Sequence, residues 1–463
     1  MLGTILKRRA VTRFAMWAVL LALPPAVAAE GDLPAPYDPD AAGPLGEVDR
    51  WLSPAVDVER LLVEDEANRN RQDIPLRIGY PMTTDLSPSA RGTWEDLPGG
   101  GQLWRLKVAS EGARWLVLGF DRFALQPGGE LRVLDPARET VLGPYTHKDI
   151  RSHRELWFPP IAGEVLVVEL FWPESLRGTT PDVHLGTVSH GYKAFGAVGR
   201  DDVFGPGGGG GGGISPDDVG DSGSCNIDVN CPLGDAWQDQ KRGVVVLLSG
   251  GFAFCTGSLI NTTADDCRPY VLTADHCGPG PSTTFGFNFE WEGCGPGGPT
   301  PVATNQTVTG ATVLAEFSGS DFSLLEMDSA PPEAFDVYYN GWTRSATPAT
   351  ESFGIHHPSG DVKKISHNMD PLVDGQNWGP DHWRVTEWEL GTTEPGSSGS
   401  PMFDQNQRIV GQLHGGTASC SSITYDEYGK VFSSWTGGGT TSTRLQDWLD
   451  PDATGATVMD GVD

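Results

Sequence analysis

A run of glycines at residues 207–213 constrains the fold of this chain more than any other feature of its sequence. Glycine has no side chain to restrict its backbone, so such a run holds no fixed path and acts as a flexible spacer. The run is therefore expected to separate two folding units, joined by a linker over residues 205–219. The length of 463 residues agrees with more than one domain.

The N-terminal segment 1–29 has the three parts of a secretory signal peptide. A basic start at residues 7–13 precedes an apolar stretch at 14–23, and small residues follow at 26–29. This pattern predicts cleavage and export, so we expect a secreted, extracellular protein. No later segment approaches the run of about 20 apolar residues that a bilayer requires, so we expect no membrane association after signal cleavage. An uncleaved anchor is the alternative.

The cysteines and the charge both indicate an extracellular protein. All seven cysteines, from Cys225 to Cys420, follow the glycine run, which predicts disulfides with one thiol left over. The net charge of −29 disfavours nucleic acid and anionic membranes as partners, because both would be repelled. We interpret the charge as favouring solubility outside the cell. The alternative is that its electrostatic field attracts cationic substrates. We expect a monomer.

Residues 30–204 contain repeated β-like runs separated by turns and no motif with recognisable chemistry. This pattern predicts a small β-sandwich. Because this half lacks cysteine, we expect a temporary, β-rich pro-domain; the alternative is a permanent module that binds a surface or polymer. The runs lie at residues 103–108, 115–118, 131–134 and 165–170.

Residues 220–463 alternate short strand patterns with loops rich in glycine and proline. Such a pattern, with almost no helical periodicity, predicts an all-β barrel or sandwich. Only residues 443–449 have a helical pattern, which predicts one terminal helix. The strand patterns lie at residues 243–248, 269–273, 285–289, 385–388 and 408–413.

A turn of small residues at 396–401 is typical of a serine nucleophile loop. It would present the Ser398 hydroxyl beside the backbone N–H groups of Gly396 and Ser398, which form the expected oxyanion hole. Removing one such donor costs roughly 3 kcal/mol of transition-state stabilisation where it has been measured. Taken alone, the turn also fits an ordinary surface loop.

A serine hydroxyl needs a base, and an acid that orients the base. His276 ends an apolar run, and a disulfide between its neighbour Cys277 and Cys255 would hold the loop that carries it. Asp321 precedes an alternating strand that would place a carboxylate under the imidazole. The order His276, Asp321, Ser398 is that of the chymotrypsin-like double β-barrel and differs from the orders of subtilisins and α/β-hydrolases. Such a triad requires no metal or organic cofactor.

Residues 220–463 resemble the secreted bacterial lysyl endopeptidases, a chymotrypsin-like serine protease family. The resemblance extends through the whole region and includes the segments around all three candidate catalytic residues. The motifs that carry it lie at residues 223–229, 255–259, 276–278, 320–322, 355–358, 393–401, 411–416 and 434–439.

This resemblance implies roles for residues that the sequence alone does not single out. Asp426 would bind the lysine side chain at P1, because a carboxylate in a partly desolvated pocket favours an ammonium group. His414 and Trp378 would lie near the substrate subsites; for Trp378, ordinary aromatic packing is the alternative. The resemblance also implies three disulfides and leaves Cys267 as the odd thiol. Cys267 would be buried and inert, or it would replace a cysteine in one of these pairs. The implied pairs are Cys225 with Cys420, Cys231 with Cys294, and Cys255 with Cys277.

Two departures from known patterns bear on activation. Trypsin-like zymogens use an Asp immediately before the nucleophile, where this chain has Ser397, so that ion pair cannot form and activation is expected to depend on the pro-segment. Family members cut after lysine just before the mature start, but residues 215–219 contain no basic residue, and the nearest upstream are Arg200 and Lys193. The mature enzyme would keep part of the linker, or another protease would trim it, or the specificity is not strict for lysine.

Together these observations predict a secreted zymogen whose domain at residues 220–463 is a serine endopeptidase cleaving after lysine through an acyl-enzyme. Its partners would be polypeptide substrates and its own pro-domain. A broader Lys/Arg or other P1 preference is one alternative. A catalytically inactive secreted binding protein of the same fold is another.

Overall fold

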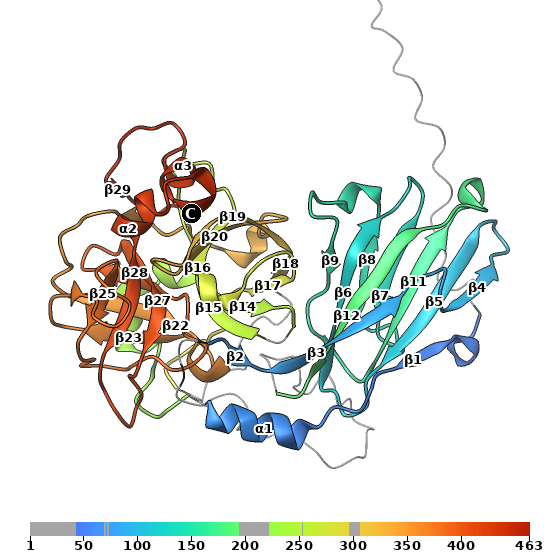
Figure 1. Cartoon of the computed structure of the whole chain (residues 1–463), viewed down its shortest axis with the longest axis horizontal. Coiled ribbons are helices and arrows are strands. Elements are labelled where there is room, and N and C mark those ends of the chain that lie inside the picture. The colour runs from blue at the N-terminus through green and yellow to red at the C-terminus, as the bar shows by residue number, and fades with distance from the viewer. Residues whose placement is uncertain (1–42, 69–70, 72–73, 194–221, 252, 296–305) are drawn as a thin grey trace, which may run out of the picture. The chain divides into compact units, whose positions relative to one another are not determined.

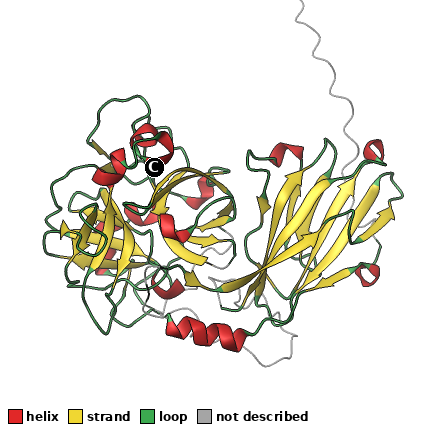
Figure 2. Cartoon of the chain, viewed as in Figure 1, coloured by secondary structure: helices red, strands yellow, loops and turns green. Residues whose placement is uncertain are grey.

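The structure is a computed structural model that describes residues 43–68, 71, 74–193, 222–251, 253–295 and 306–463 (Figure 1). The segment expected to be a signal peptide and the expected linker at 205–219 lie outside the described residues. Strands predominate in the described part of both halves of the chain (Figure 2). This composition confirms the predicted all-β class.

The first half of the chain is built around two β-sheets. One sheet has the order β1-β5-β11-β7-β8 with β4 beside β5, and the other has the order β10-β6-β12-β3 with β9 beside β6. Their strands are β1 (Arg50–Leu52), β3 (Gly79–Leu86), β4 (Thr93–Asp96), β5 (Gln102–Ala109), β6 (Trp115–Ala124), β7 (Glu130–Leu134), β8 (Val141–Tyr145), β9 (Leu156–Trp157), β10 (Ile161–Ala162), β11 (Val165–Trp172) and β12 (Asp182–Gly191). The short strand β2 (Leu76–Arg77) belongs to neither sheet and pairs with β15 (Ala253–Leu259).

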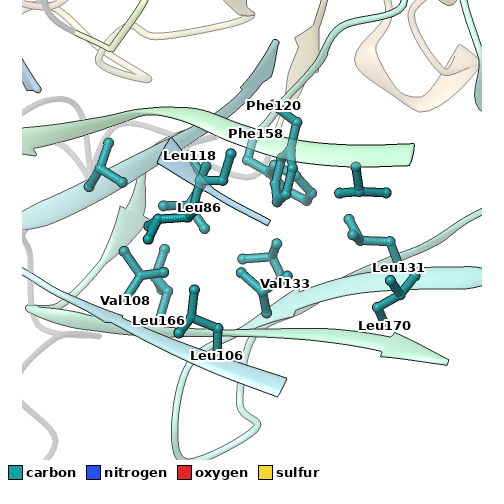
Figure 3. Close-up of a cluster of buried hydrophobic side chains, with 14 of the residues drawn as sticks. Leu86, Leu106, Val108, Leu118, Phe120, Leu131, Val133, Phe158, Leu166 and Leu170 are labelled. Carbon is teal, nitrogen blue, oxygen red and sulfur yellow. The ribbon is translucent and has the colours of Figure 1, made fainter. Parts of the chain in front are cut away.

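The two sheets of the first half enclose a hydrophobic core. Leu86 and Leu118 from one sheet face Leu106 and Leu166 from the other, as Figure 3 shows. All four side chains are buried. Alternate residues of each strand supply this core, as expected for a sheet with one face covered. The region is therefore β-rich, as predicted.

One helix of the first half was not predicted. Helix α1 (Val58–Ala67) is capped by Asp57, whose carboxylate accepts a hydrogen bond from the Arg60 backbone N–H at 3.0 Å. Arg60 also pairs with Glu64 one turn later. Leu61 is its one buried residue. The cap and the ion pair therefore stabilise a helix that buries little apolar surface.

The second half contains two larger sheets, which correspond to the two barrels of the chymotrypsin-like fold. One has the order β18-β17-β14-β15-β16-β20-β19, and the other has the order β13-β23-β22-β26-β27-β28-β25-β24 with β21 beside β27 and β29 beside β21. The strands of the first are β14 (Val244–Ser249), β15 (Ala253–Leu259), β16 (Tyr270–Ala274), β17 (Thr283–Gly286), β18 (Thr307–Thr309), β19 (Ala311–Phe317) and β20 (Phe322–Met327). Those of the second are β13 (Ile227–Asp228), β21 (Trp342–Thr343), β22 (Ser352–His356), β23 (Lys364–Asn368), β24 (Val373–Asp374), β25 (His382–Val385), β26 (Pro401–Asp404), β27 (Ile409–Gly416), β28 (Asp426–Lys430) and β29 (Val458–Met459).

Short helices complete the described part of the chain. The α-helices of the second half are α2 (Val431–Thr436) and α3 (Gln446–Leu449). The 3-10 helices are η2 (Leu45–Glu47), η3 (His147–Asp149), η4 (Glu174–Leu176), η6 (Pro232–Trp237), η7 (Gln240–Gly243), η8 (Asp275–Cys277), η9 (Glu333–Phe335), η10 (Pro358–Gly360) and η11 (Thr441–Thr443). None of the helices in the described ranges is long and apolar enough to cross a membrane.

Several predicted elements differ from the structure. The predicted helix at 443–449 is limited to α3, α2 precedes it, and the chain continues into β29. The predicted strand at 285–289 stops at Gly286, and Asn288 has a positive φ of 52° that an extended strand does not allow. The predicted strand at 385–388 is the end of β25, and Trp388 lies beyond it in a loop. In these cases apolar residues are buried outside regular strands.

Candidate active site

His276 and Asp321 meet because the strands that precede and follow them are paired. β16 and β20 run antiparallel with Ala274 opposite Phe322, which places η8 beside the residue before β20. Asp321 Oδ2 lies 2.7 Å from His276 Nδ1, and its Oδ1 accepts a hydrogen bond from the His276 backbone N–H at 3.0 Å. The buried carboxylate therefore fixes both the ring and the backbone of His276. It also favours the tautomer with the proton on Nδ1 and a lone pair on Nε2.

The His276 ring nitrogen that faces away from Asp321, Nε2, is the candidate base. Among the described residues, His276 Nε2 is buried and has no hydrogen-bond partner. The structure thus lacks the hydrogen bond between Ser398 Oγ and Nε2 that a poised triad contains. Such contacts are often long or poorly aligned in the absence of substrate and shorten in the substrate complex.

The loop that carries Ser398 is shaped by glycines at two positions. Gly396 has φ of 100° and Gly399 has φ of 80°, values that other residues rarely adopt. A Cβ at position 396 would lie 2.9 Å from the His357 carbonyl oxygen, and one at position 399 would lie 2.2 Å from Thr273 Oγ1. Side chains at either position would push the loop away from the neighbouring backbone.

The same loop is tied to the sheet that carries His276 and Asp321. The backbone N–H of Thr256, in β15, donates to the Ser398 carbonyl oxygen at 2.8 Å, and its hydroxyl donates to the Gly396 carbonyl oxygen at 2.9 Å. Cys277 Sγ lies 3.9 Å from that Ser398 oxygen. Ser398 is therefore held next to the residue that follows His276, although its turn leads into β26 of the other sheet.

The structure contains the three disulfides that the family resemblance implies: Cys225–Cys420, Cys231–Cys294 and Cys255–Cys277. The third links β15 to η8 and so restrains the segment of His276. Cys267 is the free thiol; it is exposed, not buried, and its sulfur lies 3.8 Å from the Asp463 carbonyl oxygen.

Asp426 begins β28 and is completely buried. Its Oδ2 accepts hydrogen bonds from Trp388 Nε1 at 2.7 Å and Thr393 Oγ1 at 2.6 Å. Its Oδ1 makes no hydrogen bond of good geometry within the described ranges. Burial raises the pKa of Asp426 to about 6, against the lowering effect of Thr393, Trp388 and the Ala418 N–H. A buried carboxylate with an unused oxygen favours a cationic ligand.

Gly416 and Thr393 both lie next to the Asp426 carboxylate, and Thr393 links it to the candidate nucleophile. A Cβ at Gly416 would lie 2.1 Å from Asp426 Oδ1, so only a glycine lets the backbone of β27 approach this oxygen so closely. Thr393, which donates to Oδ2, belongs to the loop that continues to Ser398. One loop thus contacts the acidic group and carries the serine hydroxyl.

His414 and Trp378 lie together beside the candidate triad. Their rings stack at 4.1 Å between centroids, and the His414 ring is stacked 5.6 Å from that of His276. His414 Nδ1 lies 3.7 Å from Asp321 Oδ2. Burial lowers the pKa of His414 to about 4, although the Asp321 charge acts in the opposite direction. The ring is therefore neutral at neutral pH and forms a flat wall next to His276.

The sequence reasoning missed some side chains that contact these candidates. His382 Nε2 lies 3.0 Å from His414 Nδ1, and Trp388 and Thr393 contact Asp426. Thr393 lies in a motif already noted, but its distance in sequence from Asp426 gives no sign of the contact. For His382 and Trp388 no sequence signal distinguishes them from packing residues.

Within the described residues, two clusters offer potential metal ligands, and both already make other bonds. Cys255 and Cys277 are joined as a disulfide, so their sulfurs are not thiolate ligands. His276, Asp321 and His414 form the second cluster, in which Nδ1 of His276 and Oδ2 of Asp321 already hydrogen-bond each other. A metal ion there would compete with that hydrogen bond.

Comparison with known proteins agrees with this geometry. The family model for the lysyl endopeptidase C-terminal domain matches residues 219–429, and that for the lysyl endopeptidase N-terminal domain matches residues 52–192. A lysyl endopeptidase of Pseudomonas aeruginosa is 29% identical over 396 residues, which cover 78% of this chain and 79% of that protein. The chain belongs to the lysyl endopeptidase family. It is a serine endopeptidase, and its first half corresponds to the N-terminal domain of the family.

Among solved structures, similarity is more distant. A Glu endopeptidase is 19% identical with a TM-score of 0.30, covering 46% of this chain and 94% of that one. The Rv3671c protease of M. tuberculosis in its active form is 18% identical with a TM-score of 0.28, covering 44% of this chain and 80% of that one.

Proposed function

We propose that this member of the lysyl endopeptidase family cleaves peptide bonds after lysine, with His276, Asp321 and Ser398 as its catalytic triad. His276 would take the Ser398 proton as the hydroxyl attacks the carbonyl carbon, and would later give it to the leaving amine. Asp321 would hold the ring and stabilise its charged form. Water would then hydrolyse the acyl-enzyme, with the Gly396 and Ser398 N–H groups stabilising the oxyanion in both steps.

The observation that carries the lysine specificity is the environment of Asp426. Its Oδ2 accepts from Trp388 and Thr393, whereas its Oδ1 lies against Gly416 and makes no hydrogen bond of good geometry within the described residues. A lysine ammonium is a compact charge that a single oxygen can bind. An arginine guanidinium pairs best with both oxygens of a carboxylate, and here one of them is already engaged. This arrangement supports lysine over arginine at P1.

We also propose that the chain is a secreted precursor. Residues 1–29 would be the signal peptide, 30–204 the pro-domain, 205–219 the linker and 220–463 the protease domain. The matches of the family's N- and C-terminal domains on either side of the glycine run support this division. In solution we expect the mature enzyme to be a monomer.

A P1 profile of the processed enzyme, measured by mass spectrometry on a peptide library, tests the specificity. We expect cleavage after lysine to dominate, and we expect the Asp426→Asn variant to lose at least about 100-fold in kcat/KM on lysyl substrates, because a neutral amide no longer pairs with the ammonium group. Equal cleavage after arginine would overturn the preference. Ser398→Ala is the control for catalysis. Unchanged hydrolysis by that variant would overturn the triad and leave the binding-protein alternative.

A further inference from the structure

The residue before the candidate nucleophile belongs to a buried chain of hydrogen bonds. Ser397 Oγ lies 2.8 Å from His356 Nδ1, and His356 Nε2 lies 2.9 Å from Ser366 Oγ. Ser366 Oγ donates to the Thr392 carbonyl oxygen at 2.8 Å, and the Glu394 N–H donates to Ser397 Oγ at 3.3 Å. The side chains of Ser397, His356 and Ser366 are all completely buried. None of them serves the triad or the Asp426 pocket directly.

The Thr392 carbonyl oxygen, which can only accept, and the neutral ring of His356 together set the direction of these hydrogen bonds. The Ser366 hydrogen is used on the Thr392 oxygen, so Ser366 Oγ accepts a hydrogen from His356 Nε2. Burial lowers the pKa of His356 to about 3, and the ring is therefore neutral with its one N–H on Nε2. His356 Nδ1 then accepts from the Ser397 hydroxyl, whose oxygen accepts from the Glu394 N–H. Each donor among these hydrogen-bonded residues has one acceptor, and none of the side chains needs to be charged.

Both ends of the chain of hydrogen bonds lie on the nucleophile loop. Thr392 is at one end and Ser397 at the other, whereas His356 and Ser366 come from the neighbouring strands β22 and β23. The Ser397 backbone N–H also donates to the Glu394 carbonyl oxygen at 3.0 Å, so two hydrogen bonds between Glu394 and Ser397 close this turn. The two strands therefore hold the loop at Ser397, between the two residues whose N–H groups would form the oxyanion hole.

We propose that His356 is a positioning residue that acts through Ser397 to hold the Gly396 and Ser398 N–H groups in their oxyanion-binding arrangement. This inference rests on the proposed role of Ser398. In trypsin-like enzymes an Asp at the position of Ser397 is held by a newly formed N-terminal ammonium group. Here a neutral histidine from a neighbouring strand does the same work. The oxyanion loop of this protein thus requires no charged chain terminus.

The test separates binding of the oxyanion from binding of the lysine side chain in the Asp426 pocket. We would compare wild type with His356→Phe, which keeps a ring of similar size but makes no hydrogen bond, and with the milder Ser397→Ala. A peptidyl-lysine aldehyde reports on the oxyanion hole, because it forms a tetrahedral adduct with the serine; a simple alkylamine reports only on the Asp426 pocket. Active-site titration normalises each rate to the folded, competent fraction, and all variants are expressed as the full-length precursor.

For His356→Phe we expect kcat to fall by roughly 10- to 1,000-fold, since misplaced oxyanion donors cost rates of this order. Aldehyde affinity should fall in parallel, while KM and alkylamine affinity change less than about threefold. Ser397→Ala should show the same selective loss at smaller size. Ser400→Ala is the matched control, because its buried hydroxyl in the same loop has no hydrogen-bond partner in the described part of the chain; it should behave as wild type.

Equal losses in aldehyde and alkylamine affinity would overturn the proposal, as would titrated rates unchanged in both His356→Phe and Ser397→Ala. If His356→Phe does not fold, the Ser397→Ala result decides. Failure of the proposed function is distinguishable, because in that case Ser398→Ala would retain activity. If Ser398→Ala is inactive but His356→Phe and Ser397→Ala both bind the aldehyde normally, the triad stands and only the proposed role of His356 is refuted.

Discussion

At the scale of single residues, the same burial that prepares Asp426 for an ammonium group opposes its ionisation. Its pKa rises from 3.8 to about 6 in the folded protein. Above pH 4 the unfolded chain holds fewer protons at this position than the folded one, so this group lowers the free energy of unfolding as pH rises from about 4 to 6. The maximum cost is about 3 kcal/mol, reached once the folded carboxyl group is also ionised.

The Asp426→Asn variant should therefore be more stable than its parent at pH 8, by about 1 to 3 kcal/mol, and no more stable at pH 4. Trp388 and Thr393 can still donate to the amide oxygen, so their hydrogen bonds are kept. Urea unfolding at the two pH values, with Ser398→Ala in both proteins to prevent autolysis, measures the difference. The same gain at both pH values would contradict the ionisation argument.

At the scale of elements, the disulfide Cys255–Cys277 joins β15 to the 3-10 helix η8 that carries His276. Its sequence separation of 22 residues corresponds to about 3 kcal/mol of unfolding free energy in the loop-entropy account. Replacing both cysteines with serine should lower stability by this amount and reduce kcat more than KM, because the base loses its support. Chemical unfolding and steady-state kinetics check both effects. Cys267→Ser, which removes the exposed free thiol, is the control, and an equal loss in that variant would contradict the assignment.

The elements also show why the sequence predicted part of the site and not the rest. The segments of His276 and Asp321 end or begin short apolar strands, and a local pattern locates such strands. The packing of Trp378 on His414, and the contact of His382 with it, depend on how loops return between β24, β25 and β27. Helix α1 was missed although Asp57 is a typical N-cap and Val58, Leu61 and Leu62 follow it at helical spacing. Local periodicity predicts strands, whereas contacts across loops depend on tertiary packing.

At the scale of the whole molecule, the remaining question is where the precursor is cut. Lys193 is the last lysine before the expected protease domain, yet it is integrated into the first half of the chain. Its ammonium group pairs with Asp65 at 2.8 Å, its N–H donates to the Ile78 carbonyl oxygen at 3.2 Å, and its carbonyl oxygen accepts from Trp115 Nε1 at 2.8 Å. A protease cleft binds an extended segment whose backbone groups are available, so the bond after Lys193 is a poor substrate while these contacts hold.

We therefore predict that the mature N-terminus is not Ala194 and that Lys193→Gln leaves the cleavage site unchanged. Intact mass measurement and N-terminal sequencing of the secreted protein check both points. The Ser398→Ala precursor identifies the protease responsible: trimming that persists in this variant requires another enzyme, whereas accumulation of the full precursor indicates self-cleavage. A wild-type enzyme that begins at Ala194, together with a Lys193→Gln precursor that is not processed, would contradict the prediction. That result would mean that the contacts of Lys193 open before activation, and that the first half of the chain unfolds locally to release the protease domain.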